Sequence, residues 1–133
     1  MSTVTTHSTD EIKKAGQLLT KVTHDASVAG GWWHDITTGE DLHGKRNVGE
    51  LLCLIHSEIS EGMEGHRKNM MDDKLPHRKM IEVELADAVI RIFDFAGGFN
   101  LDVAGAIAEK LEFNAHREDH KLENRKLTNG KKY

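Results

Sequence analysis

Two pairs of acidic residues have a spacing with a clear chemical meaning. Glu58 and Glu61 follow the apolar run LLCLIH, and Glu84 and Asp87 lie in the motif ELAD further along the chain. A spacing of three places both members of a pair on one side of a helix. Four carboxylates gathered in one place repel one another unless cations neutralise them. Oxygen ligands favour a hard cation, so the pairs predict a site for Mg²⁺, with Mn²⁺ as its substitute.

The angular position of Glu58 supports a metal site. At about 100° per residue, Glu58 falls between Leu54 and Leu51, inside the apolar sector of its helix. Glu61 lies at the edge of the same sector. A charge beside the apolar stripe is costly unless something compensates it, whereas a solvated glutamate would lie on the opposite side.

The second pair allows a simpler interpretation when it is taken alone. Glu84, Asp87 and Asp94 share a narrow polar window with Arg91 on a helix that is otherwise apolar. This window could be a solvated face in which Arg91 pairs with Asp87 or Glu84, or it could face a cavity. The wide apolar surface of this helix also needs cover, which predicts a homo-oligomer.

A third group of polar residues lies near the carboxyl end. Lys110, Asn114, Arg117 and Lys121 recur at the spacing of one helical stripe. Spacing alone favours a solvated stripe. Beside a metal cluster, however, the stripe would bind phosphate groups, because metal alone leaves part of their negative charge unpaired.

The elements that must position these residues are helices. Capping residues and apolar periodicity predict helices over about 9–26, 48–71 and 76–96, and a fourth capped by Asn100 through about Asp119. A loop over about 27–47 and a basic tail over about 121–133 complete the chain. The pattern predicts an all-α, four-helix bundle-like fold in a single domain over 1–133.

Composition excludes several classes of function. The net charge is −4 and the basic residues are scattered, so we expect no binding to polymeric nucleic acid. No segment is long and apolar enough for a membrane helix, and the N-terminus has no leader pattern, so we expect no membrane partner and no processing. Cys53, the single cysteine, lies in the apolar run and is interpreted as a small buried side chain. A cytoplasmic location is expected.

Together these motifs resemble the MazG-like all-α nucleoside triphosphate pyrophosphohydrolases. The family is marked by an E-x-x-E pair and an E-x-x-D pair on successive helices, which Glu58, Glu61, Glu84 and Asp87 match. The segment KLEFNAHREDHK matches its lysine, asparagine and arginine motif, and Asp94 matches a further acidic position. The resemblance covers about residues 45–133. It implies Mg²⁺-dependent cleavage of a nucleoside triphosphate to a monophosphate and pyrophosphate, in a dimer or tetramer.

The resemblance also implies that base recognition lies in the N-terminal portion. Trp32 and Trp33 stand in the long loop, where one indole is expected to anchor the loop to the core and the other could stack on a nucleobase. We take Trp33 as the substrate-binding ring and Trp32 as an additional candidate. Arg46 could assist, although it is equally consistent with a solvated helix entry.

Two other classes of function stay open. A di-iron carboxylate bundle also gathers glutamates inside four helices, but it usually needs Glu-x-x-His pairs, and neither acidic pair here ends in histidine. A non-catalytic helical module for oligomerisation or metal binding could instead pair its acidic window with basic residues of a neighbouring chain.

Overall fold

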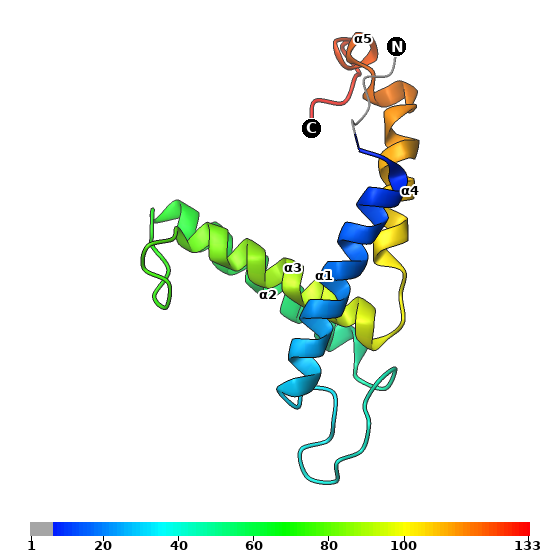
Figure 1. Cartoon of the computed structure of the whole chain (residues 1–133). Coiled ribbons are helices and arrows are strands. Elements are labelled where there is room, and N and C mark those ends of the chain that lie inside the picture. Colours follow the sequence, from blue (N-terminus) through cyan, green and yellow to red (C-terminus); the bar gives the residue numbers. More distant parts are fainter. Residues whose placement is uncertain (1–6) are drawn as a thin grey trace. The chain divides into compact units, whose positions relative to one another are not determined.

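The chain folds into helices joined by loops (Figure 1). The computed structural model describes residues 7–133. Its elements are α1 (Thr9–Ala29), α2 (Val48–Arg67), α3 (Met80–Gly98), α4 (Val103–Ala115), the 3₁₀-helix η1 (Glu118–His120) and the one-turn helix α5 (Leu122–Arg125). The described residues contain no β-strand, only two isolated β-bridges. The all-α prediction is confirmed, while the bundle-like arrangement stays a prediction.

Two predicted helix starts are confirmed in detail. At the start of α1, the backbone N–H of Glu11 donates to Ser8 Oγ at 3.1 Å, and the Glu11 carboxylate accepts from the Ser8 backbone N–H. This reciprocal pair is a capping box. At the start of α2, the Asn47 side chain accepts from the backbone N–H of Glu50 at 2.9 Å. Local side-chain chemistry therefore fixes both N-termini.

Other predicted boundaries were wrong. The second helix ends at Arg67 rather than Met71, and Pro76 does not open the third helix, which begins at Met80. Residues 68–79 instead form a turn region in which Asp72 accepts from two backbone N–H groups, closed by a bridge between Met71 and Lys79.

The fourth helix also differs from its predicted bounds. Asp102, not Asn100, caps it by accepting from the backbone N–H of Gly105 at 2.8 Å. Asn100 has a φ of 53°, outside helical geometry. The helix ends at Ala115, before the predicted end at Asp119.

The described residues form two compact units. One comprises residues 19–101, with the second half of α1, the long loop, α2 and α3. The other comprises residues 7–18 and 102–133, where Gly16 of α1 lies against Ala104 of α4. The single-domain assignment stays a prediction.

The α2–α3 pair is the frame of the larger unit, and the two helices lie side by side (Figure 1). Two glycines of α2 permit this close approach. A Cβ atom at Gly65 would lie 2.7 Å from the Cβ of Met80, and one at Gly62 would lie 3.5 Å from the Cβ of Glu84. Small residues at these positions therefore bring Glu84 of α3 against the acidic stretch of α2.

The prediction that Cys53 is a buried side chain was wrong. Its side chain is exposed on α2 rather than buried. Within the same run Leu51 is buried whereas Leu52 is exposed. The apolar run is therefore wider than the buried face of α2. Membership of an apolar run therefore did not decide burial.

No helix within residues 7–133 has both the length and the apolar character needed to cross a membrane. The prediction about the N-terminal leader concerns residues 1–6 in part, and these lie outside the described residues.

Candidate metal centre

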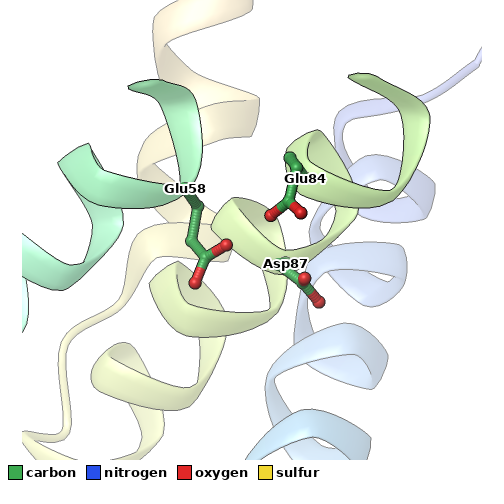
Figure 2. A group of neighbouring side chains, drawn as sticks. All are labelled: Glu58, Glu84 and Asp87. Atoms are coloured by element: carbon green, nitrogen blue, oxygen red, sulfur yellow. The ribbon is translucent and has the colours of Figure 1, made fainter. Parts of the chain in front are cut away.

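Three of the four predicted carboxylates converge between α2 and α3. Figure 2 shows Glu58 on one helix facing Glu84 and Asp87 on the other. One oxygen atom from each residue lies within 4.8 Å of the others, which is close enough for all three to contact one cation. Glu58 and Glu84 are buried and Asp87 is half-buried. The placement of Glu58 inside the apolar sector is therefore confirmed.

Glu61 stands at the edge of this group. Its side chain is exposed, but it lines the same pocket and interacts with Glu84 through a hydrogen bond and through its charge. All four predicted carboxylates thus line one pocket, with three in the inner group and Glu61 in contact with it through Glu84.

The electrostatics of Glu84 reflect this crowding. A hydrogen bond with Glu58, followed by burial and a hydrogen bond with Glu61, raises the pKa of Glu84 to about 8. Burial, then the charge of Glu58, also raises the pKa of Asp87, and the positive charge of Arg91 opposes this shift. Near neutral pH the cluster therefore retains a proton on Glu84, which lowers the repulsion among the carboxylates.

Arg91 compensates one member of the cluster. Its Nε donates to Glu58 Oε1 at 3.0 Å, between α3 and α2. The ion pair therefore joins the two helices, in place of the pairing with Asp87 or Glu84 that the solvated-face alternative supposed, although the charge of Arg91 also acts on Asp87. The physical reason is that Glu58 is buried, and a charge-assisted hydrogen bond from the facing helix offsets its loss of hydration.

The carboxylates open into a pocket of about 730 Å³. Its walls combine the four acidic residues with apolar side chains from the turn region, among them Met70, Met71 and Leu75. Asp72 also lines the pocket, is buried, and contributes to the raised pKa of Asp87. Sequence reasoning missed Asp72, because an aspartate in a turn is ordinary and its only signal was the pair DD in NMMDDK.

The predicted basic stripe does not lie on one helix. Lys110 and Asn114 belong to α4, whereas Arg117 and Lys121 are the residues that precede η1 and α5. The prediction of a continuous stripe on one helix was therefore wrong, because α4 ends at Ala115. All four residues belong to the unit of 7–18 and 102–133, and the carboxylates belong to the other unit.

The cations of this segment already have partners. Arg117 donates two hydrogen bonds to Asp119, at 3.0 and 2.7 Å, and Lys121 donates to Glu118 at 2.8 Å. The ammonium of Lys110 lies 4.8 Å from the centre of the Phe113 ring. Asn114 Oδ1 is buried without a hydrogen-bond partner among the described residues. A phosphate ligand at Arg117 would have to compete with Asp119.

The burial of the two tryptophans is the reverse of what the assignment of Trp33 to the substrate requires. Trp33 is 0% exposed and Trp32 is 67% exposed. The indole N–H of Trp33 donates to Asp94 Oδ1 at 2.9 Å, and its ring fills the space beside Gly98. Trp33 therefore anchors the loop, and the assignment of this ring to a nucleobase is corrected, because no face of it is open.

Asp94 and Arg46 are likewise part of this anchor. Asp94 lies 2.9 Å from His24 Nδ1 and accepts from Trp33, so it does not join the acidic cluster. The guanidinium of Arg46 stacks 4.9 Å from the centre of the Trp33 ring, and its Nη1 donates to the backbone carbonyl of Trp32. His24 and His43, which complete the surroundings of Trp33, were not identified from the sequence.

No family model matches the chain, and no curated protein or solved structure does either. The resemblance to the MazG-like family therefore rests on the sequence motifs, and any function rests on those motifs and on the geometry of the site.

Proposed function

We propose that the chain is a MazG-like, Mg²⁺-dependent nucleoside triphosphate pyrophosphohydrolase. The observation that carries this proposal is the convergence of Glu58, Glu84 and Asp87 within 4.8 Å, in a pocket that Glu61 also lines. The raised pKa of Glu84 supports it, because the metal-free cluster holds a proton that a bound cation would displace. The donor set, with oxygen ligands only, suits Mg²⁺ and Mn²⁺.

The proposed reaction adds water to the triphosphate and breaks the P–O bond between the α and β phosphates. When bound, Mg²⁺ would supply charge neutralisation for the phosphate oxygens. Glu58, Glu84 and Asp87 would hold the ion, and one of the four carboxylates would orient the attacking water. No protein nucleophile is required, because alignment and electrostatic stabilisation carry phosphoryl chemistry of this kind. The pocket of about 730 Å³ has room for a nucleotide beside the carboxylates.

A panel of ribo- and deoxyribonucleoside triphosphates, tested with Mg²⁺ and with Mn²⁺, separates the three classes of function. Release of pyrophosphate supports the proposal and ranks base and sugar preference. An iron-dependent absorption band without hydrolysis would instead favour the di-iron bundle. Absence of both would favour the oligomerisation module.

Arg117 is proposed to bind the polyphosphate together with Lys110 and Asn114. We expect Arg117→Ala to raise KM for the triphosphate about tenfold and to lower kcat, as for loss of a hydrogen bond to a charged group. Mn²⁺ binding without nucleotide should not change. Lys126→Ala removes the same charge from an exposed position nearby and is the matched control. Unchanged steady-state kinetics in Arg117→Ala would remove Arg117 from the substrate site.

A homo-oligomer is proposed because large apolar side chains of α2 and α3 are exposed in the single chain. These are Leu52, Ile59, Met63, Leu85, Val89 and Ile90. Contact between these surfaces in two copies would remove them from water. Sedimentation equilibrium at micromolar concentration is expected to give the mass of a dimer, or of a tetramer built from two dimers. A folded and active monomer would contradict this proposal.

A further inference from the structure

A network of four contacting side chains connects the long loop to two helices in the unit of residues 19–101. His24 of α1 and His43 of the loop face each other with their Nε2 atoms 2.8 Å apart. On the other side of each ring, His24 Nδ1 lies 2.9 Å from Asp94 Oδ1, and His43 Nδ1 lies 2.5 Å from Asp41 Oδ1. The contacts of this network therefore run from Asp41 to His43, then to His24 and then to Asp94.

Only one number of protons in this network satisfies every hydrogen-bonding atom. An ionised carboxylate can only accept hydrogen bonds, so Nδ1 of each histidine must carry a proton. In two neutral rings both Nε2 atoms would then present lone pairs to each other at hydrogen-bond distance. One additional proton between them satisfies both atoms, whereas two would place a pair of N–H donors face to face.

The surroundings favour this one-proton state. The backbone N–H and the ring of His43 lower the pKa of Asp41, with smaller contributions from the charges of His43 and His34. Asp94 also accepts from the indole of Trp33. Both carboxylates are thus held as acceptors. The guanidinium of Arg46 stacks on Trp33, the ring that both histidines contact. Two carboxylates flanking the pair stabilise the single positive charge that the two rings share.

We infer that His24 and His43 share one proton and act as a pH-sensitive clasp that holds the loop of residues 30–47 onto α1 and α3. Removing the shared proton or adding a second one opens the clasp. The rings of both histidines lie 5.2 Å from the Trp33 ring, so opening of the clasp also exposes Trp33, which anchors the loop. This inference is independent of the proposed hydrolysis.

The clasp predicts a bell-shaped pH dependence of loop opening. In a Trp32→Phe background, Trp33 is the single tryptophan and its fluorescence reports its exposure. Cleavage by trypsin after Lys45 and Arg46 reports opening of the same loop. We expect slow cleavage and a buried emission maximum in a central pH range. Cleavage should be about tenfold faster on both the acid and the alkaline side, as for loss of a charge-assisted hydrogen bond. Protection that does not depend on pH would overturn the inference.

Two variants separate the shared proton from packing. In His43→Gln the side-chain amide can donate to His24 Nε2 without an added proton, so the alkaline loss of protection should disappear. In His43→Leu the loop should be open throughout. His34→Gln, which removes a neighbouring titratable ring, is the control. It should still lose protection from cleavage at both acid and alkaline pH. Retention of the alkaline loss of protection in His43→Gln, or its absence in His34→Gln, would contradict the clasp.

Nitrogen NMR of the imidazoles tests the proton count directly in the wild-type chain, even if His43→Leu does not fold. The inference predicts protonated Nδ1 atoms in both rings and Nε2 shifts between those of a protonated and an unprotonated nitrogen. A ring with an unprotonated Nδ1 would overturn it. So would stoichiometric uptake of Zn²⁺ by both Nε2 atoms in chelator-treated protein, because a metal would then take the place assigned to the proton.

Discussion

Replacement of Glu61 by glutamine, or of Asp87 by asparagine, is expected to lower pyrophosphate release at least about a hundredfold, the usual effect of losing one group that stabilises charge in a transition state. Both substitutions keep the shape of the side chain and remove one negative charge. Asp87 belongs to the group of oxygen atoms within 4.8 Å, and Glu61 interacts with Glu84 beside it. Metal affinity should therefore fall together with activity.

The same variants should keep their fold. Circular dichroism is expected to show an unchanged helical signal, because neither side chain supports the helix backbone. Glu82→Gln is the matched control, since Glu82 is exposed on α3 and pairs with Arg78 outside the pocket. It should retain full activity. Wild-type turnover in Glu61→Gln or Asp87→Asn would remove that residue from the metal site.

Replacement of Glu84 by glutamine is expected to stabilise the metal-free chain at alkaline pH. The folded pKa of Glu84, about 8, lies above its ordinary value of 4.5. Between these two values the unfolded chain has released a proton that the folded chain retains, so the stability of the wild type falls as pH rises through this interval. The loss approaches about 1.4 kcal/mol per pH unit. Below the interval the two proteins should be equally affected by pH.

Thermal unfolding in the presence of a chelator measures this effect. Above pH 8 the Glu84→Gln variant should melt at a higher temperature than the wild type. Addition of Mg²⁺ should reverse the order, because the ion binds the ionised cluster of the wild type and not the variant. Glu82→Gln should follow the wild type in both conditions. Parallel pH curves for wild type and Glu84→Gln would show that Glu84 ionises normally.

Helical periodicity was sufficient to place Glu58. Its angle relative to Leu51 and Leu54 is a property of one helix, and that angle is confirmed by its burial. The partner of Arg91 could not be obtained in the same way. The contact with Glu58 depends on how closely α2 and α3 approach, and this distance is set by Gly62 and Gly65, whose effect a single-helix projection does not include.

The tryptophans show a second limit of sequence reasoning. Trp32 and Trp33 are adjacent and identical in type, so composition could not decide which ring is buried. The choice is made by residues far along the chain, namely Asp94, which accepts from the Trp33 indole, and Gly98, which leaves space for its ring. Likewise, Pro76 is typical of a helix start, but here the hydrogen bonds of Asp72 organise the turn before α3.

Phosphorus NMR of a nucleoside triphosphate incubated with the protein and Mg²⁺ tests the central proposal most directly. The proposed function predicts that signals of nucleoside monophosphate and pyrophosphate appear together, only when Mg²⁺ or Mn²⁺ is present, and that they do not appear with Asp87→Asn. Formation of nucleoside diphosphate and orthophosphate, or no turnover of any triphosphate in the panel with either ion, would contradict it.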